Sequence, residues 1–224
     1  MLADFGAQGS VSMRLIAIRH GETEWNVLAR EMGQLDSPLT KRGVEQAKAL
    51  AGRLERQSIA AIYSSDLGRA VQTAHIIAAM AKVEFFPEAG LRERHMGVFQ
   101  GLTSAEMEQR FPTEYSSYRG DPHHFQIPHG ESGQQRLERS VQVLTAIAER
   151  HPEGTVVVVT HGGLLMGFFE HVLGMSPGNG WRFRKQNAAY NCFEYVNGQW
   201  LLETWNDTTH FDGLGSLDDT VIPK

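Results

Sequence analysis

"LIAIRHGETEWN", residues 15–26, passes directly from four apolar residues to an arginine, a histidine and a glycine. The apolar run has no polar alternation and contains two β-branched isoleucines, which is typical of a strand buried on both faces. We therefore expect a strand over residues 14–18 that ends at Arg19. His20 then lies just beyond the carboxyl end of this strand.

A second apolar run ends in the same way. "TVVVVTHGG", residues 155–163, is the clearest strand in the chain, and it leads into His161 and Gly162. In open α/β sheets ligands bind beyond the carboxyl ends of the strands, so His20 and His161 face one pocket if these strands are neighbours. Glycine after each histidine allows a sharp turn and brings N–H groups close to an anion, which makes Gly162 a candidate for substrate binding. A strand-end histidine that only caps a carbonyl is the alternative interpretation.

Strands and helices alternate along most of the chain. Apolar residues at helical spacing and capping signals predict helices after Thr40, Asp66, Thr103 and Ser132, and an apolar helix that ends near Gly174. Further strands are expected over residues 59–65, 83–86, 190–196 and 199–205, the last two joined by an Asn-Gly hairpin turn. This order predicts an α/β fold with a mostly parallel mixed sheet and an antiparallel edge.

No linker divides the chain, so we expect a single domain over residues 14–206. Residues 1–13 are expected to be a flexible N-terminal tail that is not a signal peptide, and residues 207–224 a C-terminal tail. The Pro-, Gly- and His-rich residues 118–130 are expected to form a loop or lid. A polar loop is expected before Thr40.

The composition of the 224 residues is that of an ordinary globular protein, with 41% hydrophobic and 21% charged residues. A net charge of -5 gives no footprint for a nucleic acid, and no stretch is long and apolar enough to cross a membrane. The densest basic run, residues 181–185, is explained equally well by a solvated face and by an anion site. Cys192 is the only cysteine, which excludes a disulfide framework and favours a cytoplasmic location. The monomeric and homodimeric states both stay open.

Two further charged residues can reach the same pocket. "SSDLGRAVQTA", residues 64–74, places Arg69 in the first turn of a helix, where the helix N-terminus adds positive potential. Glu93, in "LRERHMG", belongs to a strand-to-helix connection. A pocket with Arg19, Arg69, two histidines and one carboxylate suits phosphoryl chemistry, because it offers cations for the oxygens, an imidazole to attack phosphorus and an acid for the leaving oxygen.

The four motifs "RHGETEWN", "SSDLGRAVQTA", "LRERHMGVFQG" and "VVVVTHGG", in this order, resemble those of the histidine phosphatase superfamily. The resemblance runs from about residue 14 to 205 and implies a phosphoglycerate mutase-like fold, a three-layer α/β/α sandwich. It implies that His20 is the nucleophile that becomes phosphorylated. Glu93 would protonate the leaving alkoxide and then activate water.

The resemblance also implies which residues hold the phosphate. Arg19, Asn26, Arg69 and His161 match the phosphate-binding residues of the family, and Thr23 occupies a position whose side chain often joins them. No metal and no cofactor are implied, because the two arginines and a protonated His161 would supply the positive charge.

The sequence departs from the mutases of this family and resembles its phosphatase branch, including PhoE-type broad-specificity phosphatases. Met96 stands where mutases have a tyrosine, Ser104 stands at the position of a substrate-contacting lysine, and Arg110 and Arg119 do not form an adjacent pair. The expected activity is hydrolysis of small phosphorylated metabolites. A phosphoglycerate mutase and a catalytically silent binding module of the same fold are the alternatives.

Two other patterns have a competing interpretation. His123, His124 and His129 could suggest a metal site, but no acidic residue stands at a recognisable ligand spacing, so a histidine-rich lid is favoured. "GMSPG", residues 174–178, formally fits the nucleophile elbow of serine hydrolases. That motif must join a strand to a helix, whereas this one is expected to follow a helix.

Overall fold

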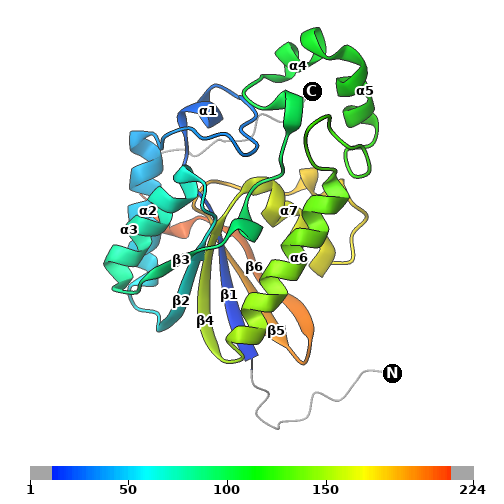
Figure 1. Cartoon of the computed structure of the whole chain (residues 1–224). Helices are drawn as coiled ribbons and strands as arrows, with labels where there is room; N and C mark the ends of the chain where they lie inside the picture. The colour runs from blue at the N-terminus through cyan, green and yellow to red at the C-terminus, as the bar shows by residue number, and fades with distance from the viewer. Residues whose placement is uncertain (1–11, 213–224) are drawn as a thin grey trace.

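The computed structural model describes residues 12–212, and within them six strands form one sheet in the order β3-β2-β4-β1-β5-β6. The parallel strands are β1 (Ser12–Arg19), β2 (Ile59–Ser64), β3 (Phe85–Pro87) and β4 (Gly154–Thr160). The hairpin of β5 (Tyr190–Val196) and β6 (Gln199–Asp207) adds the antiparallel edge (Figure 1). The mostly parallel mixed sheet is confirmed.

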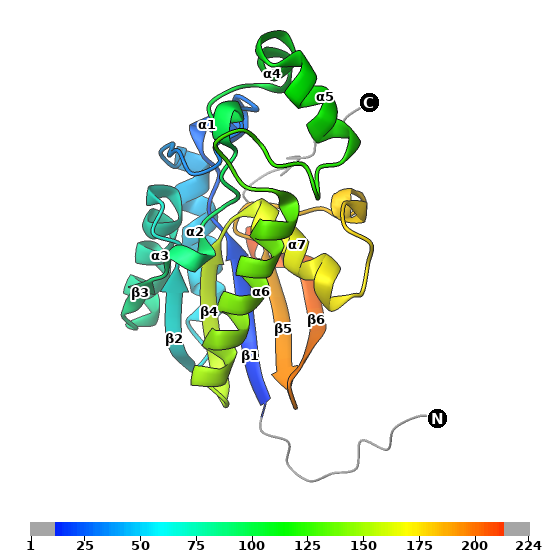
Figure 2. The same ribbon diagram turned by 45° about the vertical axis from the view of Figure 1, so that its right-hand side comes forward.

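Four long helices cover the two faces of the sheet. Helices α2 (Lys41–Leu54) and α3 (Gly68–Ala81) cover one face, and α6 (Gly133–Arg150) and α7 (Gly162–Val172) cover the other (Figure 2). Alternate residues of β1 serve the two layers: Leu15 packs with the core under α6 and α7, and Ile16 packs with the core under α2 and α3. The three-layer sandwich and the strand buried on both faces are therefore confirmed.

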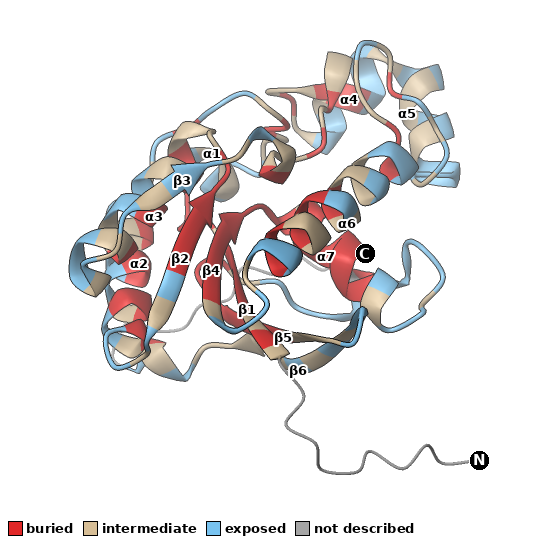
Figure 3. Cartoon of the chain, turned by 60° about the horizontal axis from the view of Figure 1, so that its bottom comes forward, coloured by how far each residue is buried: buried red, intermediate tan, exposed pale blue. Residues whose placement is uncertain are grey.

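The register of the central strands fixes the place of the site. β1 pairs with β4 so that Arg19 lies opposite Thr160, and the Thr160 carbonyl accepts the His20 N–H at 2.9 Å. The chain leaves both strands at the same level, so His20 and His161 follow side by side. The buried residues of the strands lead up to this point (Figure 3).

A small helical cap stands over the carboxyl ends of the strands. It contains α4 (Ser104–Arg110) and α5 (Pro112–Gly120), which pack around the buried Phe99 in a cluster separate from the two sheet cores (Figure 1). Because α4 begins with the predicted capping box at Thr103, its start is confirmed. Helix α5 was not predicted, since it begins at Pro112 without a side-chain cap, and it takes up the first residues of the expected loop 118–130.

Other local expectations can be compared with the structure. The loop before Thr40 contains the short helix α1 (Glu24–Val27), and the hairpin turn at Asn197 and Gly198 has positive φ at both residues, as an Asn-Gly turn requires. Residues 174–178 follow α7 and precede the 3₁₀ turn Asn179–Arg182, so this motif does not join a strand to a helix. That placement excludes the nucleophile elbow.

The predicted tails fall largely outside the described residues, which end at residues 12 and 212. Strand β6 reaches Asp207, and the 3₁₀ turn Thr209–Phe211 follows, with Phe211 packed against the α2–α3 side of the sheet. The division into one domain and two tails stays a prediction. None of the helices between residues 12 and 212 combines the length and apolar character needed to cross a bilayer.

Candidate active site

His20 and His161 meet where β1 and β4 end. Their ring centroids are 5.3 Å apart, and both side chains are buried. The pocket expected from the two strand ends therefore exists. It is a cavity of about 360 Å³ at the carboxyl ends of the strands, the end of the sheet over which the cap lies.

The surroundings of His20 leave one ring nitrogen available for attack. Nδ1 lies 2.8 Å from the Gly21 carbonyl oxygen, which can only accept a hydrogen bond, so Nδ1 carries the hydrogen. The lone pair is then on Nε2. Burial, and next the charge of Arg69 together with His161 and Arg19, hold the pKa of His20 well below its usual range. His20 is thus a neutral imidazole with a free lone pair, the form that a nucleophile requires.

His161 lies behind the cavity and is also neutral. Its Nε2 is 2.8 Å from Ser65 Oγ, whereas its buried Nδ1 has no hydrogen-bond partner. Burial, with Arg69 and Arg19 adding to it, holds the pKa of His161 well below its usual range. The expectation of a protonated His161 is therefore wrong for the free pocket, because burial disfavours the charged ring and the two neighbouring guanidinium groups add to this effect.

Arginine side chains are fixed beside the two histidines. Arg69 begins α3, is almost completely buried, and donates from Nη1 to the Leu35 carbonyl at 2.7 Å and from Nη2 to the Gly33 carbonyl at 2.8 Å. Its Nε has no partner and is left for a ligand. Arg19 donates from Nη1 to the Lys185 carbonyl at 2.8 Å, which anchors the loop before β5 to the site.

Asn26 lines the cavity, but Thr23 does not. Thr23 is buried and caps α1: its hydroxyl and the Asn26 side chain make a reciprocal capping box. A second amide, Asn187, donates to the His20 carbonyl at 2.8 Å and to Asn26 Oδ1 at 3.3 Å. In the free pocket Thr23 therefore orients Asn26, instead of facing the phosphate position as the resemblance implied. Asn187 was not foreseen from the sequence.

Glu93 is held at the side of the cavity by two backbone donors. Its Oε1 accepts the Arg94 N–H at 2.8 Å and its Oε2 accepts the Gly163 N–H at 2.7 Å. A side chain at Gly163 would collide with this carboxylate, so the second glycine of the late motif makes room for it. Burial alone would raise the pKa of Glu93, but Arg136, the two N–H donors and Lys185 lower it below the usual value. Glu93 is ionised in the free pocket.

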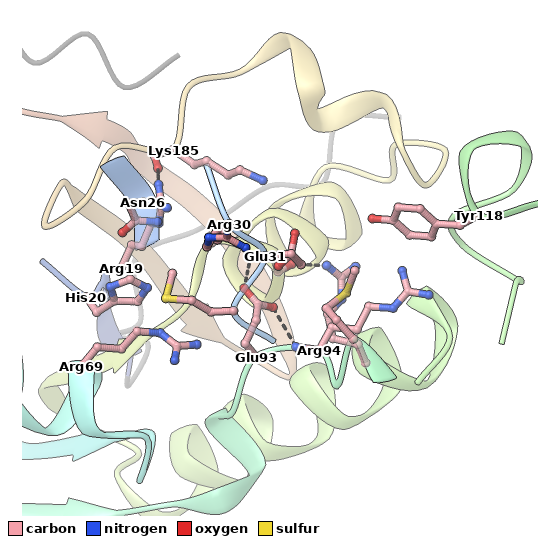
Figure 4. A pocket seen from close by; sticks show the side chains of 15 residues that line it. Arg19, His20, Asn26, Arg30, Glu31, Arg69, Glu93, Arg94, Tyr118 and Lys185 are labelled. Carbon is pink, nitrogen blue, oxygen red and sulfur yellow. Dashed lines mark hydrogen bonds between the residues drawn. The ribbon is translucent and has the colours of Figure 1, made fainter. Parts of the chain in front are cut away.

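The predicted residues meet as the sequence suggested (Figure 4). Arg19, His20, Asn26, Arg69, Glu93 and Gly162 all line the cavity. Other lining residues were not predicted from the sequence: Arg30, Glu31, Met32, Arg94, Arg136 and Gly163. Met96 was noted only as a departure from the mutases, and partial signals existed for Tyr118, in the expected loop or lid 118–130, and for Lys185, in the basic run 181–185.

The histidine-rich segment lies outside the cavity lining. His124 pairs with Asp121 at 3.0 Å, and none of His123, His124 and His129 lines the cavity. Within residues 12–212 no group of three His, Cys, Asp or Glu side chains could hold a metal ion. In place of these histidines, Arg94 ties the segment to the site by donating to the carbonyls of Glu131, Pro122 and Phe125.

Comparisons with known proteins agree with this geometry. The model of the histidine phosphatase superfamily (branch 1) matches residues 15–208. A metal-independent phosphoserine phosphatase of Arabidopsis thaliana is 37% identical over 91% of this chain and 85% of its own length. A probable phosphoglycerate mutase, GpmB, of Proteus mirabilis is 34% identical over 92% of this chain and 98% of its own length. The solved structure of Bacillus stearothermophilus YhfR superposes with a TM-score of 0.83 at 32% identity, covering 88% of this chain and 98% of that one.

Proposed function

The chain belongs to the histidine phosphatase superfamily and is a phosphoric monoester hydrolase, and we propose that it cleaves small phosphorylated metabolites through a phosphohistidine at His20. One observation carries the proposal. A neutral imidazole with its lone pair on Nε2 stands between Arg19 and Arg69, with a carboxylate in the same cavity.

In the first step Nε2 of His20 attacks phosphorus, and the bond from phosphorus to the ester oxygen breaks. Arg19, Arg69 and Asn26 hold the phosphoryl oxygens, and Nδ1 of His161 donates to one of them, which gives that buried nitrogen its missing partner. The charge of the transferring group is thereby spread over fixed donors, as a loose phosphoryl transition state requires.

Glu93 donates a proton in the first step and accepts one in the second. A bound phosphate brings negative charge next to Glu93 and offsets the cations that lower its pKa, so the carboxyl can carry the proton that the leaving alkoxide takes. In the second step a water molecule attacks the phosphohistidine. Glu93 accepts the proton of this water, and inorganic phosphate leaves with His20 restored.

Hydrolysis is favoured over the mutase reaction by the places of three residues. Ser104, Arg110 and Arg119 belong to the cap helices, and none of them lines the cavity. These three residues are thus without a role in holding a phosphoglycerate carboxylate, and Met96, at the remaining position of departure, lines the cavity with an apolar side chain. Cations other than these, Arg136 and Lys185, reach the cavity from α6 and from the loop before β5.

The proposal also covers the binding partners, the cellular location and the oligomeric state of the enzyme. The net charge of -5 supports partners that are small metabolites instead of nucleic acids or membranes, and the buried free thiol of Cys192 supports a cytoplasmic location. A monomer or a homodimer is compatible with it.

Phosphate release from p-nitrophenyl phosphate, phosphoserine and 3-phosphoglycerate, measured with and without EDTA, tests the proposal. We expect turnover that EDTA leaves unchanged. Conversion of 3-phosphoglycerate to 2-phosphoglycerate that is stimulated by 2,3-bisphosphoglycerate and is faster than hydrolysis would establish the mutase instead. Inertness toward every compound, with a folded chain, would favour the silent binding module.

A further inference from the structure

A second carboxylate lines the cavity, and the chemistry described so far does not use it. Glu31 is half-buried in the segment between α1 and α2. Its N–H donates to the Leu102 carbonyl at 2.9 Å, and its carbonyl accepts the Gly101 N–H at 2.7 Å. These two backbone bonds fix the Glu31 backbone against the turn at Gly101 and Leu102 that leads into α4.

Glu31 stands on the side of the cavity that the leaving group must occupy. In the view of Figure 4 it lies beyond Glu93 as seen from His20, toward Tyr118. The electrostatic neighbours agree: the charge of Glu31 raises the pKa of Tyr118, and Glu93 is the strongest charged influence on Glu31 itself. Neither carboxylate is among the groups that shift the pKa of His20.

Among the residues that the structure describes, no cation is in contact with the carboxylate of Glu31. Within residues 12–212 it takes part in no ion pair, and its hydrogen-bond partner is the Gly33 N–H. Burial and the negative charge of Glu93 raise its pKa, while Lys185 and Arg69 oppose this from a distance. Glu31 therefore keeps a charge that is only partly compensated.

The arginines on the same wall are committed to other partners. Arg30 pairs with Glu106 at 2.8 Å and also donates to the Gly101 carbonyl. The Arg94 guanidinium donates hydrogen bonds to three backbone carbonyls, and Arg136 donates to the Gly163 carbonyl. Lys185 and Arg69 act on Glu31 only through their charge, with no ion pair to it among the described residues, so a positive group in contact with Glu31 would come with the ligand.

We propose that Glu31 is a specificity-determining residue that selects phosphomonoesters whose leaving group carries a protonated primary amine, such as phosphorylated amino alcohols and amino acids. An ammonium group brings one positive charge and three N–H donors to a carboxylate that lacks both. A hydroxyl in the same place supplies one donor and no charge, so the partly buried carboxylate stays uncompensated. This inference rests on the proposed phosphatase function.

Two pairs of substrates isolate the amine, since their members differ only by ammonium or hydroxyl at one carbon. They are phosphoserine with 3-phosphoglycerate, and phosphoethanolamine with 2-hydroxyethyl phosphate. We expect kcat/KM to favour the amine in both pairs by about tenfold or more, the size of one charge-assisted hydrogen bond. In Glu31→Gln this preference should fall by about tenfold in both pairs. Glu24→Gln, which removes an exposed carboxylate of α1, is the matched control and should keep the wild-type preference.

The outcomes separate this inference from the proposed function. Equal kcat/KM within each pair in the wild-type enzyme, or the same preference in wild type and Glu31→Gln, would overturn the role of Glu31 while hydrolysis itself continues. An equal loss on both members of each pair would also overturn it, because Glu31 would then act on the reaction and not on selection. Failure of the proposed function would show instead as no hydrolysis of any of the four substrates or of p-nitrophenyl phosphate.

Discussion

The tautomer and the position of His20 are set by groups that do not touch the substrate. The Gly21 carbonyl fixes the tautomer, the Thr160 carbonyl of β4 holds the backbone, and Asn187 supports the His20 carbonyl from the loop before β5. The sequence predicted the histidine but not the support from Thr160 and Asn187, because these residues lie more than a hundred positions away in the chain.

The residues that line the site were predictable where a motif carried them. Arg19, His20, Asn26, Arg69, Glu93 and Gly162 came from short motifs, and all of them line the cavity. Glu31 and Arg136 do not belong to any recognisable sequence motif. Whether they line the cavity depends on how the α1–α2 segment and α6 are placed relative to the ends of the strands. The neutral state of His161 could not be predicted from the sequence either, because it depends on how deeply the folded protein buries the ring.

Glu93→Gln tests the proton-transfer role at the residue scale. Glutamine keeps the shape of the side chain but cannot supply the proton, so we expect kcat on an alkyl phosphate to fall by about 10²- to 10⁴-fold. The loss on p-nitrophenyl phosphate should be much smaller, since nitrophenolate leaves without a proton. Glu108→Gln, an exposed carboxylate of α4, is the control and should change neither rate. Equal losses of kcat on the two substrates would show that Glu93 is not the general acid.

At the scale of elements, the contact between the His20 loop and α2 is a tight constraint on the site. The sequence suggested that Gly21 allows a sharp turn and a close approach of N–H groups to an anion. In the structure a Cβ at Gly21 would collide with the Gly43 backbone of α2, and a Cβ at Gly43 would collide with the Glu22 carbonyl. Both glycines are needed because the first turn of α2 packs directly on the loop that carries His20.

A matched pair of substitutions in α2 tests this contact. Gly43→Ala should lower the free energy of unfolding by about 1–3 kcal/mol, as overpacking does in a rigid contact, and should lower kcat by displacing His20. Gly52→Ala lies in the same helix with open space around it, and it should raise stability by about 0.5–1 kcal/mol because alanine favours a helix. Urea unfolding measures both. Equal effects of the two substitutions would show that helix propensity, and not the packing on Glu22, determines the change in the free energy of unfolding.

Elements with strong apolar periodicity, or with a capping box of the Ser/Thr-x-x-Glu/Gln type, were predictable, and shorter elements without them were not. α2 and α6 begin at their expected N-caps and the hairpin turns at its expected residues, while α3, which has no side-chain cap, was predicted from its apolar spacing. Helices α1 and α5 were missed since one has a single turn and the other begins at Pro112 without a cap.

For the whole molecule, the mostly parallel sheet followed from a general rule, but its strand order did not. Alternating strands and helices demand a mainly parallel sheet. That β1 and β4 are neighbours, which the shared pocket requires, is known from the structure. The cap was less predictable, because its core around Phe99 forms from side chains of several short segments that have no common period.

The stability of the whole protein should depend on pH through the two buried histidines. The pKa of His20 and of His161 lies well below the usual value of 6.5 in the folded state, so below pH 6.5 the unfolded chain takes up protons that the folded protein does not. Stability from these groups is therefore complete above about pH 6.5 and is lost as the pH falls below it.

Urea unfolding at about pH 7.5 and about pH 5.5 measures this effect before most carboxylates titrate. We expect a lower free energy of unfolding at the lower pH, and a smaller difference in His161→Asn, which removes one of the two groups. Unchanged or higher stability at about pH 5.5 would contradict the neutral, buried state of these rings.

The phosphorylated enzyme is the species on which the account depends. The wild-type enzyme should be mixed with a radiolabelled phosphomonoester, quenched in alkali and mapped by peptide. We predict label on His20 that is stable in alkali and lost in acid, with no label and no turnover in His20→Ala and normal labelling in His171→Ala, an exposed histidine of α7. Turnover that persists in His20→Ala, or label on any other residue, would contradict the account.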